Sequence, residues 1–117
     1  MDKTELVKQL ILTANHLKPF ADAAPLGARV WNGVEYAKVK EGEEKESDPT
    51  AFKWWSTLNT FANLIEAQST PLSDRQISYI QRELFGGMGS LIDECHDELK
   101  IGGFADKTID LFNCFRK

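Results

Sequence analysis

Apolar residues recur at helical spacing near the start of the chain, and they set the first prediction of secondary structure. Leu6, Leu10, Ala14 and Leu17 follow one another three or four residues apart on what would be one face of a helix. Asp2 stands where an N-cap is expected, three residues before Glu5. We therefore predict a helix from about Thr4 to Leu17, which Pro19 is expected to end.

A second helical stretch follows Asp48 and Pro49, a pair that suits the N-cap and first position of a helix. This helix is predicted to extend to about Gln68. Apolar residues, including the neighbours Trp54 and Trp55, cover most of its circumference, which is typical of a central, buried helix. Adjacent rings on a helix diverge by about 100°, so one is expected to face the core and the other to lie near the surface.

A third helix has the clearest beginning in the chain. Ser73 and Gln76 have the spacing of a capping box, and Leu72 and Ile77 have the spacing of a hydrophobic staple. Apolar residues at helical spacing follow, and Gly86 is expected to terminate this helix at the C′ position.

The segment between the first two helices is harder to assign. Residues 26–37 show helical spacing of apolar positions and are predicted as a helix, although Gly27 and Gly33 weaken it by about 1 kcal/mol each relative to alanine. A short strand over residues 34–39 is the alternative. Residues 40–48 contain charged residues, glycine and serine with nothing apolar to bury, which predicts a flexible acidic loop.

The last part of the chain carries two further helical signals. Ser90 and Asp93 form a cap-like pair that is predicted to begin a helix over about residues 91–99. Residues 102–103 are both glycine and interrupt the pattern, and a last helix is expected to begin at residues 106–107. Together these elements predict an all-α bundle of five or six helices.

Composition narrows the class of protein. The 117 residues suit one domain with one core, so residues 1–117 are expected to form a single domain. The net charge is −4, and no basic stripe is present, which disfavours binding to nucleic acid or to an anionic membrane surface. The chain has no membrane-length apolar run and no signal-like N-terminus, so we expect a cytoplasmic protein. Cys95 and Cys114 are expected to be reduced and buried, with a disulfide as the less favoured alternative.

Three glycines crowd one short segment, which we call the glycine corner, residues 86–90. Gly86, Gly87 and Gly89 precede Ser90 and a predicted helix N-terminus, where free amides could hold an anion. The pattern matches no phosphate-binding motif, however. A helix stop followed by a tight turn is therefore the favoured interpretation.

The densest ionisable cluster lies directly after the glycine corner. Asp93, His96 and Asp97 would share one helix face, and Glu94 and Glu98 flank them. Such a set contains ligands for a divalent metal, but a single helix seldom completes a site, so no metal is expected. The favoured interpretation is an exposed acidic surface that meets a basic partner.

Candidate catalytic groups do not assemble in the sequence. No Cys-His pair, nucleophile elbow or complete metal-binding set is recognisable. His16 is expected near the end of the first helix, where the helix dipole favours it. We therefore expect neither an enzyme nor a cofactor.

The segment 84–93, Leu-Phe-Gly-Gly-Met-Gly-Ser-Leu-Ile-Asp, resembles the signature of a family of small uncharacterised bacterial proteins. That signature is an apolar residue, Gly-Gly-Met-Gly-Ser, an apolar residue, usually Asn, and Asp; here Ile92 replaces the Asn. The resemblance is specific over about ten residues and loose elsewhere. Proteins of this type resemble the small acidic immunity or antitoxin partners of bacterial toxins, which is an analogy of size and charge.

We accordingly expect a protein-interaction module, most concretely an immunity or antitoxin-type protein that binds and neutralises a basic bacterial toxin. The candidate partner-binding residues are Asp93, Glu94, Asp97, Glu98, Glu43, Glu44 and Trp54. The alternative is a small-ligand or metal-binding regulator that uses the glycine corner and the 93–98 cluster. The sequence leaves the oligomeric state open.

Overall fold

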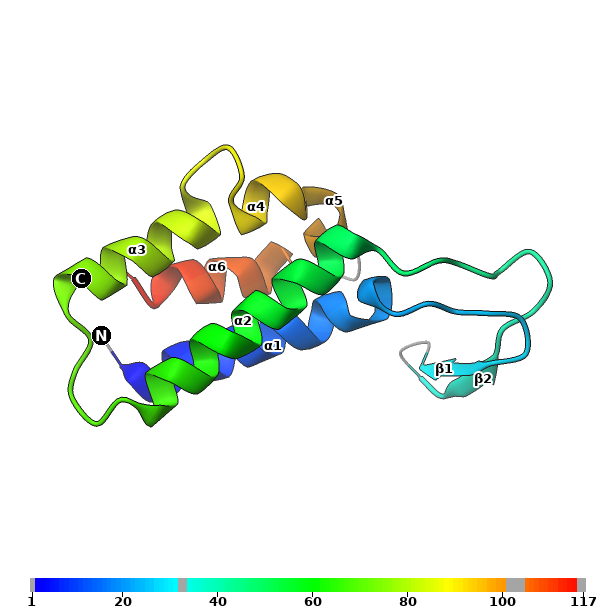
Figure 1. Ribbon diagram of the computed structural model, residues 1–117, viewed down its shortest axis with the longest axis horizontal. Coiled ribbons are helices and arrows are strands. Elements are labelled where there is room, and N and C mark those ends of the chain that lie inside the picture. The colour runs from blue at the N-terminus through cyan, green and yellow to red at the C-terminus, as the bar shows by residue number, and fades with distance from the viewer. Residues whose placement is uncertain (1, 32–33, 101–104, 116–117) are drawn as a thin grey trace.

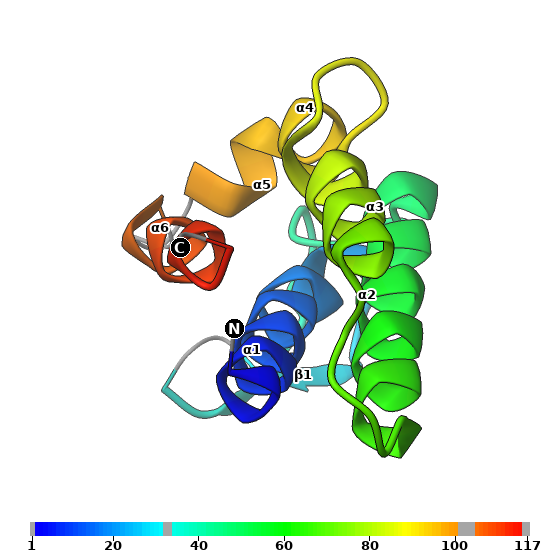
Figure 2. The ribbon, with the colours of Figure 1, turned by 90° about the vertical axis from the view of Figure 1, so that its left-hand side faces the viewer.

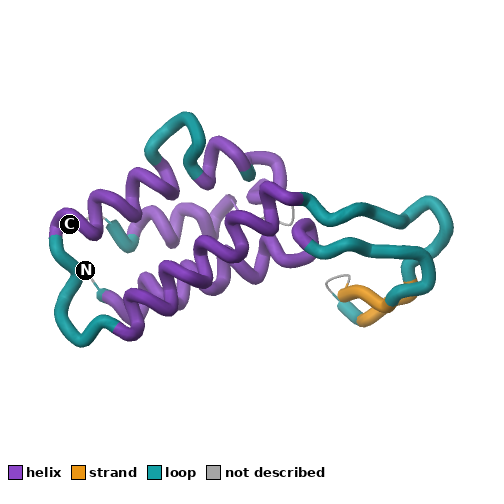
Figure 3. Tube along the Cα trace, viewed as in Figure 1, coloured by secondary structure: helices purple, strands orange, loops and turns teal. Residues whose placement is uncertain are grey.

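The computed structural model describes residues 2–31, 34–100 and 105–115, and within them it is mostly helical. Six helices and one two-stranded hairpin occur in these ranges, which confirms the predicted helical class (Figure 1). The helices form a bundle, and the hairpin lies at the end of a long connection that projects from one end of it (Figure 3). The principal extents of 50 × 28 × 22 Å reflect this projection.

Helix α1, Lys3–Ala21, begins as expected but ends later than predicted. The carboxylate of Asp2 accepts hydrogen bonds from the amides of Thr4 and Glu5 at 2.9 and 3.3 Å. Pro19 does not end the helix, because it lies in the last turn and removes a single backbone donor. The helix closes instead with the amide of Asp22 bonded to the carbonyl of Lys18 at 3.0 Å.

Helix α2, Pro49–Ala67, runs antiparallel to α1 and packs along it (Figures 1 and 2). Asp48 caps it as predicted, accepting from the amides of Thr50 and Ala51. The prediction of burial all round is wrong, because Phe52 and Leu64 are 52% and 65% exposed. Only one face of α2 is covered by other helices, so its apolar residues exceed what the core can bury.

Helix α3, Asp74–Phe85, carries the predicted capping box of Ser73 and Gln76 in full. Its end lies one residue beyond the prediction. Gly86 is the C-cap with φ −82°, and Gly87, with φ +100°, is the residue in the left-handed conformation.

The predicted helix over residues 91–99 is divided into α4, Leu91–Glu94, and α5, His96–Lys100. Cys95, at φ −116° and ψ 27°, separates the two. Helix α6, Ala105–Asn113, packs against α1 and α5 (Figure 2). The predicted break at residues 102–103 lies outside the described residues.

The prediction of a helix over residues 26–37 is wrong, and the alternative of a strand is correct for part of this segment. Strands β1, Arg29–Trp31, and β2, Tyr36–Lys38, form an antiparallel hairpin in which Val30 faces Ala37. Gly27 has φ +83°, a conformation that a helix does not contain.

The core cluster is built mainly from the helices, with Cys95 and Phe115 added from the turns beside them. Its largest fully buried side chains are Trp54, Leu6, Leu10, Leu17, Leu58, Leu84, Leu91 and Leu111. Phe85 joins α3 to the C-terminal segment through ring contacts with Phe112 and Phe115, at centroid distances of 5.2 and 6.1 Å. No hairpin side chain whose burial the structure describes belongs to this cluster.

Candidate protein-binding surface

The connection between α1 and α2 is a two-legged projection, which we call the arm, residues 23–47 with 32–33 outside the described residues. Its legs are paired by a β-bridge between Ala24 and Lys45 and, farther along the chain, by the hairpin, which turns back toward the bundle (Figure 3). The legs leave from adjacent helix ends, because the amide of Asp48 bonds to the carbonyl of Phe20 at 3.3 Å. The antiparallel packing of α1 and α2 thus positions the arm (Figure 1).

Two matching turns bend the arm, one on each leg. In the first, residues 25–28, the amide of Ala28 bonds to the carbonyl of Pro25 at 3.1 Å; in the second, residues 40–43, the amide of Glu43 bonds to the carbonyl of Lys40 at 2.9 Å. The third residue of each turn is a glycine with positive φ, +83° at Gly27 and +88° at Gly42. This arrangement is that of a type II turn, which requires φ > 0 at its third position.

Carboxylates gather at the second turn and the leg that follows it. We call residues 41–46 the acidic turn; it holds four exposed glutamates, Glu41, Glu43, Glu44 and Glu46. Glu43 and Glu44 accept hydrogen bonds only from amides of the same turn, from Lys40 and Gly42 respectively. The single cation of the acidic turn, Lys45, is directed inward, where its ammonium group donates to the carbonyl of Pro19 and lies over the Phe20 ring. The outward charge of the acidic turn is therefore negative, and the exposed cations Lys38 and Lys40 precede it in the chain.

The arm also exposes large apolar side chains that the sequence reasoning did not identify. Leu26, Val34 and Tyr36 are 61%, 83% and 66% exposed, whereas Ala24 and Val39 are the buried apolar residues of the described arm. Leu26 occupies the second position of the first turn, beside the acidic turn on the paired leg. The sequence allowed a short strand over residues 34–39, but no local pattern indicated which of these side chains would stay exposed.

A cleft of about 610 Å³ separates the hairpin from the last turn of α1. Two of the cations that line the cleft are already engaged. The ammonium group of Lys18, on α1, lies 2.8 Å from the Asp22 carboxylate, and that of Lys45, on the arm, donates to the carbonyl of Pro19. Arg29, Val30 and Tyr36 line it from the hairpin.

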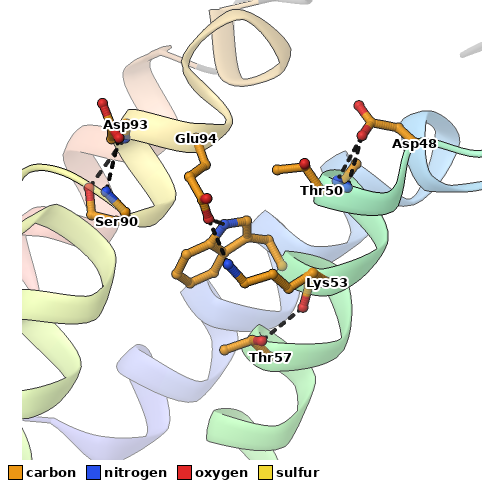
Figure 4. A network of polar contacts seen from close by, with 10 residues as sticks. Asp48, Thr50, Lys53, Thr57, Ser90, Asp93 and Glu94 are labelled. Atoms are coloured by element: carbon orange, nitrogen blue, oxygen red, sulfur yellow. Dashed lines mark hydrogen bonds and ion pairs between the residues drawn. The ribbon is translucent and has the colours of Figure 1, made fainter.

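The acidic cluster 93–98 is divided by the structure into carboxylates that support the fold and carboxylates that face solvent. Glu94 accepts from the ammonium group of Lys53 and from the indole Nε1 of Trp54, both at 2.8 Å (Figure 4). Hydrogen bonds from Lys53 and Trp54 hold the pKa of Glu94 below its usual value of 4.5. Asp93 accepts from the amide of Gly89 at 2.9 Å. Both acids thus hold α4 in place.

Asp97 and Glu98 are the members of the cluster whose carboxylates are not bonded to α2 or to the glycine corner, although Asp93 and Glu94 are also solvent-exposed. The Asp97 side chain is 97% exposed and lies 3.7 Å from His96. Glu98 is half-buried, and its backbone carbonyl contacts Nε2 of His16 at 2.9 Å, which joins α5 to α1. No group of three metal-ligating side chains comes together in the described ranges. The break at Cys95 also removes the continuous helix on which the shared face was predicted.

The glycine corner is a structural turn. The amide of Ser90 bonds to the carbonyl of Gly87, and the hydroxyl of Ser90 accepts from the amide of Asp93. A Cβ at Gly86 would lie 2.3 Å from the carbonyl oxygen of Arg82, so this position admits only glycine without a shift of the backbone. The amide of Gly89, which the anion hypothesis would use, is already donated to Asp93.

The two tryptophans diverge as predicted, and Trp54 is the inward one. Trp54 is 1% exposed, so it is not the surface anchor for which it was a candidate. Trp55 is half-buried beneath Lys18, whose ammonium group lies 4.5 Å from the ring centroid.

The two cysteines are free thiols, Cys95 buried and Cys114 half-buried, as the favoured interpretation predicted. Burial, with a smaller contribution from the charge of Glu98, raises the pKa of the Cys95 thiol to about 12. Burial also raises the pKa of Cys114. Both side chains are therefore protonated near neutral pH, which suits a structural role.

Comparisons with family models, with curated proteins and with solved structures find no match to this chain. Within the part of the chain that the structure describes, no helix is long and apolar enough to cross a membrane.

Proposed function

We propose that the protein is a protein-interaction module whose arm binds a basic protein partner. The observation that carries this proposal is the arm itself, a projection whose described residues combine exposed apolar side chains with an outward-facing acidic turn. The most concrete form of the proposal is an immunity or antitoxin-type protein that neutralises a basic bacterial toxin.

The composition of the arm suits a binding surface better than a structural connection. Exposed apolar side chains such as Leu26 and Val34 do not stabilise the fold, and the free energy falls only when a partner removes them from water. A centre of apolar contacts with charged groups around it is the usual anatomy of a protein interface. The backbone bonds that pair Ala24 with Lys45 and Gly27 with Val39 place Leu26 and the acidic turn on facing legs of the arm, so one partner surface can contact both.

Charge supports a basic partner. The four glutamates of the acidic turn form no ion pair with any residue that the structure describes, and the ammonium group of Lys45 is bonded to the carbonyl of Pro19. Exposed carboxylates of this kind raise the association rate with a cationic surface, and salt weakens the effect. Asp97 adds a further exposed carboxylate on α5. The alternative small-ligand site has less support, because Gly89 and Asp93 satisfy each other.

The test is affinity capture from the native cell with three matched proteins. These are the wild type, the arm variant Glu43→Lys/Glu44→Lys, and the control Glu66→Lys/Asp110→Lys, which makes the same charge change at exposed positions outside the arm. We expect a basic protein to bind the wild type and the control and to bind the arm variant at least about tenfold more weakly at low salt.

The captured protein is then expressed alone and together with the wild type. Toxicity alone and rescue by co-expression are the results that an immunity protein requires. Equal binding by the arm variant and the control would contradict binding through the arm, and a harmless partner would contradict the immunity assignment.

A further inference from the structure

The glycine corner presents one side chain that takes no part in its construction. Gly86 is required by the approach of the Arg82 carbonyl, and Gly87 and Gly89 are required by φ values of +100° and +83°. Ser90 is buried and caps α4. Met88 stands at the apex between these residues with 99% of its surface exposed.

The turn that carries Met88 is held by bonds that do not involve its side chain. The amide of Ser90 reaches the carbonyl of Gly87 at 3.0 Å, and the amide of Gly89 reaches Oδ2 of Asp93 at 2.9 Å. The amide of Asp93 in turn donates to the hydroxyl of Ser90 at 3.2 Å. The backbone of the apex is therefore fixed from both sides, whatever the chemical state of the Met88 thioether.

The other sulfur atoms of the described chain are protected from oxidants. Cys95 is fully buried, and Cys114 is half-buried with its thiol directed at the carbonyl of Asp110 at 3.5 Å. A thiol reacts with peroxide as its thiolate, and burial keeps the pKa of both cysteines above the ordinary value. The thioether of methionine has no proton to lose, so its reactivity depends on access alone.

We infer that Met88 is a modification site at which a peroxide oxidises the thioether to the sulfoxide. The sulfur lone pair attacks one peroxide oxygen, the O–O bond breaks as the S–O bond forms, and the second oxygen leaves as water. Sulfur loses two electrons and the peroxide gains them. The product replaces an apolar apex by a polar one.

The modification alters the surface and leaves the fold in place. Because the three bonds of the turn are made by Gly87, Gly89, Ser90 and Asp93, none of them is lost when Met88 becomes polar. A methionine sulfoxide reductase can reverse the change, since it removes the oxygen as water while two thiols join as a disulfide. The corner thus has the properties of a reversible surface switch.

The test exposes the native full-length protein to hydrogen peroxide at neutral pH and maps the oxidised peptides by mass spectrometry. N-acetylmethionine amide in the same solution is the reference. We expect Met88 to gain one oxygen at a rate within about threefold of the reference, because its exposure is nearly complete. The variant Met88→Leu should show no gain on that peptide. A native rate more than about tenfold below the reference, or oxidation of Cys114 first, would overturn the inference.

Thermal unfolding separates a surface switch from a damaging lesion. The oxidised wild type and the variant Met88→Gln, which places a polar group at the apex, should melt within about 2 °C of the untreated protein. Treatment with both stereospecific classes of sulfoxide reductase should restore the original mass. A melting temperature lowered well beyond that range would show that oxidation damages the fold. A sulfoxide that neither reductase reduces in the folded protein would show that the change is not reversible. Either result would overturn the switch.

Discussion

At the scale of single residues, Glu94 shows why an acidic cluster in a sequence is not yet a binding surface. Its carboxylate reaches from α4 to α2, where it accepts hydrogen bonds from Lys53 and from the buried indole of Trp54 (Figure 4). Trp54 is among the largest buried side chains, so its Nε1–H group needs an acceptor within the fold. Glu94 supplies that acceptor and fixes α4 against α2.

We predict that Glu94→Ala lowers the free energy of unfolding by about 1–2 kcal/mol, because it leaves the indole donor of Trp54 without its partner. Glu94→Gln retains an acceptor and should lose less. The control Asp97→Ala removes a side chain that is 97% exposed and should change the value by less than about 0.5 kcal/mol. Urea unfolding followed by tryptophan fluorescence measures all three. Equal values for Glu94→Ala and Asp97→Ala would refute the structural role of Glu94.

The same residue predicts a pH dependence of stability. Hydrogen bonds from Lys53 and Trp54 lower the pKa of Glu94 in the folded state below its usual 4.5. The ionised carboxylate therefore stabilises the fold fully above pH 4.5, and this contribution disappears as the pH falls through the lowered pKa. The stability advantage of the wild type over Glu94→Gln should thus be constant near neutral pH and shrink on acidification. Urea midpoints of both proteins at a series of pH values test this, and an advantage that grows in acid would contradict it.

At the scale of elements, the glycine corner converts a helix end into a sharp connection. Gly87→Ala and Gly89→Ala should each lower the free energy of unfolding by about 1–2 kcal/mol, because an L side chain resists the positive φ found there. Both positions have open space for a Cβ, so backbone conformation alone causes the loss. Met88→Ala is the matched control in the same turn and should be nearly neutral. The three variants are compared by urea midpoint; a loss at Met88 equal to that at Gly87 would contradict the argument.

Elements whose signals are local in sequence were predicted well. The Asp48–Pro49 start of α2 and the capping box of Ser73 and Gln76 depend on groups three residues apart, so a single sequence contains the whole interaction. The arm was missed because its pairing joins Ala24 to Lys45, across a separation that no local pattern encodes. Over residues 26–37 the helical spacing favoured a helix, whereas each strand of the hairpin is stable only because the other strand pairs with it.

The candidate surface was predictable only in part, for a similar reason. The exposed glutamates 43 and 44 follow from the composition of their segment, which has nothing apolar to bury. The different roles of the carboxylates in the 93–98 cluster do not follow from composition, because Glu94 is bonded to Lys53 and Trp54, which lie 41 and 40 residues earlier in the chain. Burial of Trp54 rather than Trp55 likewise depends on which face of α2 meets α1 and α4.

At the scale of the whole molecule, the helical bundle and the arm depend little on each other. The arm contributes only Ala24 and Val39 as buried apolar residues in its described part, and the core cluster contains neither. Its attachments to the bundle are polar, through Lys45 to Pro19 and through the amide of Asp48 to Phe20. Substitutions in the arm are therefore expected to leave the folding of the bundle largely unchanged.

This separation predicts that the bundle folds without the arm. Replacing residues 23–47 by a flexible linker of about four residues should join α1 to α2 as a helical hairpin, since the ends of the two helices are already in contact. Shortening the connection stabilises the fold by about 0.6 kcal/mol for each halving of its length, which offsets the small apolar burial that is lost. The free energy of unfolding, measured in urea with circular dichroism, should stay within about 1 kcal/mol of the wild type, while binding of the basic partner is abolished. An arm-deleted protein that no longer unfolds cooperatively would mean that the arm belongs to the folding unit, and a folded one that still binds would move the partner surface to the bundle.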